Sequence, residues 1–130
     1  MVRLGRQVTF HKESFTLTLT GLTAYFAFKK KIIMPYELIE NVWVDEFQAP
    51  QWMVRMPGTS ISPLHIYEGS YKYGNEWFFL SFEGRQPLLM IELKGHKKYR
   101  YVIFQIDNPT YVAAELRRRI YQYNQDLSNT

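Results

Sequence analysis

The sequence predicts a mainly β domain of about seven strands, followed by one C-terminal α-helix. Runs of alternating, β-branched and aromatic residues recur roughly every 8–12 residues between glycine-bearing turns, as in antiparallel sandwiches and barrels. Apolar residues then recur at helical spacing, which predicts an amphipathic helix over about residues 109–127. Strands are expected over about residues 7–106, and residues 1–130 are expected to form a single domain.

Alternation of apolar residues with threonine marks the first predicted strand. Phe15, Leu17 and Leu19 alternate with threonines, which is typical of a half-buried strand. Gly21 ends this strand. The alternation resumes over residues 22–28, where a further strand is expected.

The next part of the chain contains shorter elements. A strand is predicted over residues 32–34, and a proline ends it because proline donates no ladder hydrogen bond. A short helical turn over residues 36–40 and a strand over residues 42–44 follow. Another strand is possible over residues 51–56, before a loop that contains residues 57–58.

Three hairpins are predicted after this loop. Gly74–Asn75 is a two-residue turn able to take positive φ, and it separates strands over residues 66–73 and 76–82. Further strands are expected over residues 88–93 and 99–106, with a glycine-containing turn before each of them.

The C-terminal segment has the features of a helix. Asp107–Asn108 supplies a cap, and Pro109 suits the first helical position. At about 100° per residue, five apolar side chains fall within an arc of roughly 80°. They are Val112, Leu116, Ile120, Tyr123 and Leu127. Three consecutive arginines, residues 117–119, point in different directions around this helix and are expected to form a solvated surface.

Several short motifs resemble those of the bacterial pleckstrin-homology-like (PH-like) domains. In that family an Arg-x-x-Gly loop leads to a Gly-x-aromatic strand and then to apolar strands. The corresponding segments are Arg55-Met-Pro-Gly58, Gly69-Ser-Tyr71, Asn75–Leu80, Leu88–Ile91, Tyr99–Ile106 and the strand-to-helix junction Asp107–Tyr111. The resemblance covers about residues 32–120.

This resemblance implies an antiparallel split barrel of about seven strands, capped at one open end by the amphipathic helix. Bacterial members often lie beside transmembrane segments or assemble with themselves. This chain departs from them because its longest uncharged run, residues 14–28, is too short for a spanning helix. Eukaryotic relatives that bind inositol phosphates use basic residues in the turn between the first two strands, a motif with no residue-by-residue match here.

The sequence gives no pattern that indicates catalysis, a metal or another cofactor. There is no cysteine, which excludes disulfides, thiolate zinc sites and cysteine nucleophiles. His11, His65 and His96 lie in separate segments without ligand spacing. Nucleophile-elbow and phosphate-loop motifs are absent from the sequence. We therefore expect a protein that is not an enzyme and that uses no cofactor.

Clustered lysines are the strongest sign of a ligand. The formal net charge is +4, and seven of the 16 positive charges lie in two turns. These charges belong to Lys29, Lys30, Lys31, Lys94, Lys97, Lys98 and Arg100. If both turns lie at one rim, they can form a positive pocket for phosphate or anionic lipid headgroups. The preferred interpretation is that these lysines keep the sheet soluble and protect its edges.

Aromatic residues suggest other partners. Residues 77–82 leave both faces of one strand apolar, which indicates either a core or a surface for association. Tyr99 and Tyr101 beside basic residues imitate a platform for single-stranded nucleic acid. The RNA-recognition signature is missing, so nucleic acid is the less favoured partner.

The sequence therefore predicts a soluble, cytoplasmic interaction domain, or one peripheral to the membrane, that recognises a protein partner or itself. The first alternative is an anionic lipid- or phosphate-binding module. Its candidate residues are Lys29, Lys30, Lys31, Lys97 and Lys98. The second alternative is a module that binds single-stranded nucleic acid.

Overall fold

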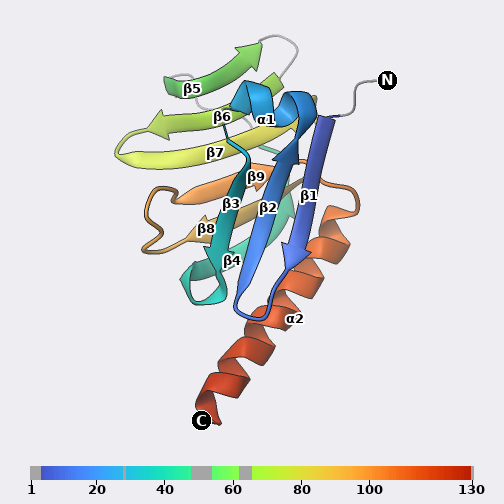
Figure 1. Ribbon diagram of the computed structural model, residues 1–130, viewed down its shortest axis with the longest axis vertical. Coiled ribbons are helices and arrows are strands. Elements are labelled where there is room, and N and C mark those ends of the chain that lie inside the picture. Colours follow the sequence, from blue (N-terminus) through green and yellow to red (C-terminus); the bar gives the residue numbers. More distant parts are fainter. Residues whose placement is uncertain (1–3, 28, 48–53, 62–65, 130) are drawn as a thin grey trace.

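The computed structural model describes residues 4–27, 29–47, 54–61 and 66–129. It confirms a mainly β fold with a C-terminal helix (Figure 1). The first sheet is antiparallel and has the strand order β1-β2-β3. Its strands are β1 (Leu4–Phe10), β2 (Ser14–Thr20) and β3 (Lys31–Pro35).

The second sheet has six strands in the order β4-β8-β9-β7-β6-β5. They are β4 (Ile39–Asp45), β5 (Val54–Ile61), β6 (Ile66–Tyr73), β7 (Glu76–Glu83), β8 (Leu88–Leu93) and β9 (Tyr101–Phe104). The helices are α1 (Gly21–Ala27), the 3₁₀ turn η1 (Tyr36–Leu38) and α2 (Pro109–Ser128). The predicted strand at 42–44, the turn after Pro35 and the C-terminal helix are thereby confirmed.

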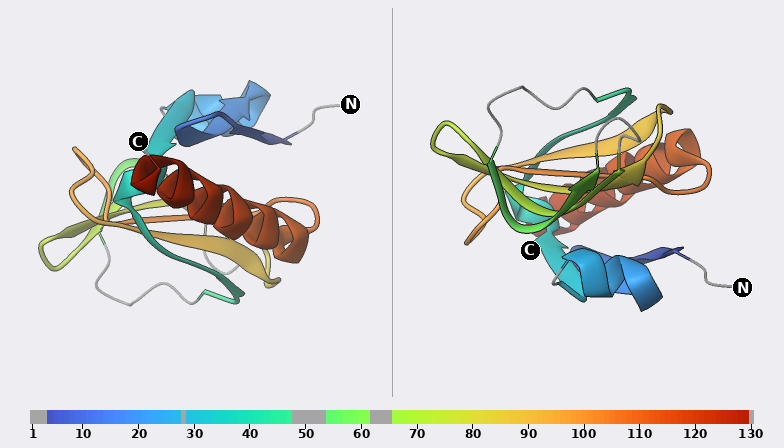
Figure 2. Two further views of the ribbon diagram at one scale, coloured as in Figure 1. Left: turned by 90° about the horizontal axis from the view of Figure 1, so that it is seen from below. Right: turned by 90° about the horizontal axis from the view of Figure 1, so that it is seen from above.

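The sheets do not close into the predicted barrel. The β1–β3 sheet and α2 instead lie on the same side of the six-stranded sheet (Figure 2). One hydrophobic cluster fills the space between them. It includes Phe15, Leu17 and Met34 of the first sheet, Phe79, Ile91 and Phe104 of the second, and Leu116 of α2. These layers explain how two separate sheets share a core.

The opposite face of the six-stranded sheet holds a second apolar cluster. Leu80 and Phe82 of β7 belong to it, whereas Phe79, which precedes Leu80, points into the first cluster. Trp43 and Tyr67 pack against this second cluster. The five apolar residues among positions 77–82 are therefore accounted for by packing on both faces, since alternate residues of a strand face opposite sides.

The predicted strand over residues 22–28 is wrong, because residues 21–27 form α1. Gly21 has a φ of +60°, which turns the chain out of β2 before the helix. Thr23 and Ala27 lie four residues apart and are both buried, so one face of α1 packs inward. Apolar residues at every second position also fit a short helix, and tertiary packing selects the helix here.

Two further expectations about the sheet fail. The predicted loop at residues 57–58 lies inside β5, where the register with β6 shifts between Arg55 and Gly58. Strands β7 and β8 do not form a hairpin, because β9 lies between them and runs parallel to β7. The hairpin turn at Gly74–Asn75 is confirmed, and Gly74 has a φ of +63°.

A buried ion pair connects the two sheets. Arg6 of β1 donates from Nη2 to Glu68 Oε1 of β6 at 2.6 Å and from Nε to Ser81 Oγ of β7 at 2.7 Å. Ser81 Oγ donates in turn to Glu68 Oε2 at 2.7 Å. Each of these three side chains is hydrogen-bonded to the other two. The triad therefore holds β1 against the second sheet by hydrogen bonds as well as by apolar packing.

Candidate functional site

The β8–β9 connection and β3 meet through His96. Its Nε2 lies 3.1 Å from the carbonyl oxygen of Ile33 in β3. Its Nδ1 accepts hydrogen bonds from the backbone N–H groups of Lys98 at 3.2 Å and Tyr99 at 3.1 Å. A neutral imidazole with its proton on Nε2 satisfies all three contacts. His96 thus joins the first sheet to the connection that carries two of the predicted lysines.

Lysine ammonium groups gather around two aromatic rings at this place. The Nζ atoms of Lys29 and Lys98 lie 5.9 and 5.4 Å from the Tyr99 ring centroid. Lys98 Nζ is also 5.1 Å from the centroid of Trp77, and Lys72 Nζ lies 5.7 Å from that same centroid. Cation–π attraction at these distances places each of these ammonium groups beside an aromatic ring. We call Lys29, Lys72, His96, Lys97 and Lys98, together with Trp77 and Tyr99, the basic rim.

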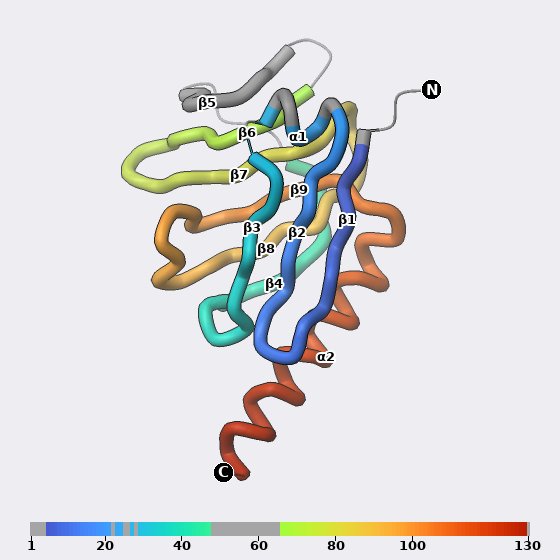
Figure 3. The backbone as a smooth tube through the Cα atoms, in the orientation of Figure 1, coloured from blue at the N-terminus to red at the C-terminus, as the bar shows by residue number. Residues whose placement is uncertain are grey.

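Backbone pairing brings these residues to one side of the molecule. The β6–β7 turn and the β8–β9 connection project in the same direction (Figure 3). Arg100 N–H donates to the Trp77 carbonyl oxygen at 2.9 Å, which joins the connection to the start of β7. Lys72 and Trp77 are direct partners in the β6–β7 register. The rim is therefore assembled from three separate segments of the chain.

Charges on the rim lysines repel one another, and the nearby carboxylate of Glu76 pairs with Arg100. Burial lowers the pKa of Lys29 below its usual value, and the charges of Lys98 and Lys97 lower it further. Within the described residues, none of the four rim lysines forms an ion pair with a carboxylate. An anion that binds here would relieve the repulsion that these charges impose on one another.

Arg100 differs from the rim lysines because carboxylates surround it. Its guanidinium contacts Glu92 at 2.5 Å, Glu40 at 3.4 Å and Glu76 at 3.7 Å. These contacts leave little positive charge for a ligand. A shallow cavity of about 200 Å³ lies between the rim and Arg100, with Asn75, His96 and Lys98 among its lining residues. We therefore expect Lys98, and not Arg100, to contact an anion in this cavity.

The predicted anion-binding residues divide into two groups. Lys29, Lys97 and Lys98 come together, as the shared-rim hypothesis requires. Lys30 and Lys31 are exposed, and Lys31 already belongs to β3. The sequence interpretation missed Lys72 and Trp77 as members of the rim. Their cross-strand pairing follows from the Gly74–Asn75 hairpin, which was a usable signal.

The tyrosines proposed for base stacking are already packed. Tyr99 is only 2% exposed, and its hydroxyl lies 2.6 Å from Ser70 Oγ. Tyr101 stacks on Phe78 with ring centroids 4.8 Å apart. A nucleic-acid platform needs open ring faces, and this arrangement offers little open face on either ring.

Acidification is expected to open the rim through His96. Burial lowers the pKa of this imidazole, and Lys97 and Lys29 lower it further, while the hydrogen bond to Ile33 opposes them. A histidine with a lowered pKa in the folded state stabilises the fold at higher pH. That stabilisation is lost as the pH falls below about 6.5, where the unfolded chain takes up the proton. Nδ1 protonation also removes the acceptor for two N–H groups.

Amide NMR signals of Lys98 and Tyr99 measure this change, and we expect both to shift as the pH falls from about 7 to about 5. A His96→Asn variant provides the control, because it removes the titrating group. Signals that titrate equally in the variant, or not at all in the natural chain, would contradict the role given to His96.

The described residues show no metal-binding cluster and no membrane-spanning helix. They contain no group of three or more histidine and acidic side chains placed to hold a metal ion, and His65 lies outside them. Neither described α-helix combines the length and apolar character needed to cross a bilayer. Comparisons of this chain with protein-family models, curated proteins and solved structures find no match.

Proposed function

We propose that this chain is a non-enzymatic binding domain that recognises a phosphate-bearing or otherwise anionic ligand at the basic rim. The observation that carries the proposal is the convergence of four lysines without carboxylate partners in the described residues. Each lysine near an anionic surface contributes roughly 1 kcal/mol of attraction. The sequence interpretation had preferred solubility as the reason for these lysines; their convergence now favours a ligand.

The relationship to PH-like domains stays part of this proposal. A run of strands followed by a C-terminal helix supports it. The parallel pairing of β7 with β9 departs from the antiparallel barrel that the resemblance implies. A cytoplasmic location, with the rim turned towards a membrane or a soluble phosphate, is the setting that we propose.

Vesicle sedimentation at low salt tests the proposed function. Pelleting with vesicles rich in phosphatidylserine should decrease strongly in a Lys29→Gln, Lys98→Gln double variant, and added salt should weaken it in the natural chain. Lys12 is exposed in the β1–β2 turn, so Lys12→Gln is a control that removes a lysine away from the rim.

A second arm distinguishes a lipid headgroup from a free anion. Titration with inorganic pyrophosphate, followed by the amide signals of the β8–β9 connection, should shift those signals if a soluble anion is sufficient. If neither vesicles nor pyrophosphate bind at low salt, the proposal is wrong. Equal losses per lysine removed in the Lys12 control and the double variant would mean that only net charge matters.

A protein partner is the second function that we propose, as the sequence first suggested. Large apolar side chains on α2 favour it, because Tyr111 and Tyr121 are 69% and 65% exposed. Self-association belongs to the same class of function, and sedimentation at high protein concentration measures it.

A further inference from the structure

Strand β4 has a free edge that lies beside α2. Among the described strands, β4 pairs on one side only, with β8. That pairing is regular from Asn41 to Asp45. The carbonyl of Val42 points away from β8, because it accepts hydrogen bonds from Arg117 of α2. In an antiparallel ladder the N–H and the carbonyl of one residue point to the same side, so the N–H of Val42 also faces the free edge. The backbone N–H and carbonyl of Val44, two residues further on, face that edge as well.

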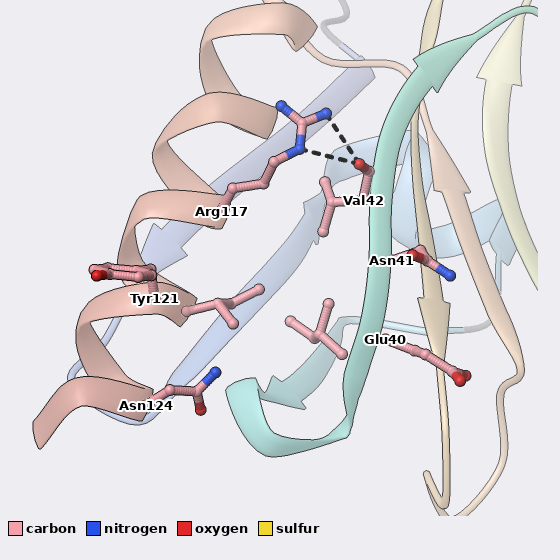
Figure 4. Close-up of a pocket in the computed structure, with 8 residues that line it drawn as sticks. Glu40, Asn41, Val42, Arg117, Tyr121 and Asn124 are labelled. Carbon is pink, nitrogen blue, oxygen red and sulfur yellow. Dashed lines mark hydrogen bonds between the residues drawn. The ribbon is translucent and has the colours of Figure 1, made fainter. Parts of the chain in front are cut away.

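A groove runs between this edge and α2 (Figure 4). It encloses about 340 Å³. Its apolar lining residues are Ile39, Val42 and Ile120, and its polar ones are Glu40, Asn41, Arg117, Tyr121 and Asn124. Such a groove offers backbone hydrogen-bonding groups on one wall and side-chain contacts on the other, which suits an extended peptide better than a second helix.

Arg117 gives the groove its charge. Its Nε and Nη2 lie 3.2 and 2.9 Å from the Val42 carbonyl oxygen. The neighbouring Arg118 and Arg119 both contact Glu115, but Arg117 has no carboxylate partner among the described residues. Glu40 points to the other side of β4 in Figure 4 and contacts Arg100. The groove therefore holds an uncompensated guanidinium beside an unpaired strand edge.

We propose that the groove between β4 and α2 binds an extended acidic segment of another protein, which adds to β4 as a further strand. A carboxylate of that segment would meet Arg117, since a guanidinium forms strong paired hydrogen bonds with a carboxylate. Apolar side chains at alternate positions would pack towards Ile120 and Ile39. This surface is separate from the basic rim and does not rest on the proposed anion-binding function.

A selection experiment tests the proposal with the full chain. Short random peptides displayed on phage are selected against the folded protein, and the best binders are synthesised with a fluorescent label for anisotropy. We expect the enriched peptides to contain Asp or Glu between alternating apolar residues. Arg117→Ala should weaken their binding about tenfold or more, because it removes a charge-assisted contact.

Matched changes separate recognition from simpler explanations. Arg117→Lys should retain part of the affinity, whereas Lys98→Gln on the basic rim should change it little. Methylation of alternate peptide nitrogens should also weaken binding about tenfold or more, because it removes the donors that pair with β4. Thermal unfolding checks that the Arg117 variants fold; Arg117 is exposed, so they are expected to do so.

Three results would overturn the proposal. They are a selection that enriches no peptide, binders that respond to neither Arg117→Ala nor nitrogen methylation, and an edge occupied by a second copy of the chain. Occupation of the edge by a second copy would appear as a dimer in sedimentation, and the Arg117 variants would change the amount of that dimer. If Arg117 only shields the edge, Arg117→Ala would increase self-association without any loss of peptide binding.

Discussion

Replacing Glu68 with alanine is expected to lower the free energy of unfolding by about 3–5 kcal/mol. The Glu68 side chain is 4% exposed, and its carboxylate accepts hydrogen bonds from Arg6 at 2.6 Å and Ser81 at 2.7 Å. The Arg6 side chain is only 6% exposed, so the substitution leaves a buried guanidinium without its counter-charge. Urea denaturation at neutral pH, followed by tryptophan fluorescence, measures the loss.

Glu115 provides a control with similar chemistry at the surface. It also contacts two arginines, Arg118 at 2.6 Å and Arg119 at 2.9 Å, and these contacts lower its pKa to about 2. All three groups are in contact with solvent, where ion pairs contribute little to stability. Glu115→Ala should therefore cost far less than Glu68→Ala. Similar losses for the two variants would contradict the importance given to burial.

A double replacement separates the cost of an unpaired charge from the value of the pair. Burial raises the pKa of Glu68 and outweighs the opposing effects of Arg6 and Ser81, so desolvation is a large part of the energetics. Arg6→Met combined with Glu68→Leu should recover much of the stability lost in Glu68→Ala, since apolar pairs often replace buried ion pairs without loss. The remaining difference between the natural chain and the double variant measures the net stability that the pair contributes, and a double variant no more stable than Glu68→Ala would contradict the cost given to the unpaired charge.

Local patterns in the sequence predicted most elements of the fold, but not how they pair. The Gly74–Asn75 turn and the periodicity of α2 depend on neighbouring residues, and both were correct. Insertion of β9 between β7 and β8 depends on contacts between distant segments, which a hairpin rule cannot detect. The segment 22–28 was predicted as a strand, but residues 21–27 form a helix. Its alternating apolar residues fit either a strand or a short helix, and the burial of Thr23 and Ala27 selects the helix.

The candidate site was predictable to a similar extent. The lysine-rich turns were visible in the sequence, which suggested that the two turns could share one rim. Whether the rim exists depends on His96, whose bond to Ile33 joins segments 63 residues apart. The groove at β4 was not predicted, since a free edge and an unpaired Arg117 are properties of strand order and helix placement.

Replacing Leu116 with alanine is expected to lower the free energy of unfolding by about 2–5 kcal/mol. Leu116 is fully buried where α2 packs on both sheets, so its truncation removes apolar contacts and leaves a cavity. Urea denaturation gives the loss directly. An unchanged slope of stability against urea concentration would show that the unfolded reference state is unaffected.

Leu127 is the matched control, because it lies on the same predicted stripe but is 53% exposed. The C-terminal end of α2 projects beyond the sheets in Figure 1, so helical periodicity continues after the core has ended. Leu127→Ala should therefore cost much less than Leu116→Ala, since less apolar surface leaves contact with the protein. If both substitutions cost the same, the end of α2 must be packed in solution. A second copy or a partner would then cover it, and the loss at Leu127 would depend on protein concentration.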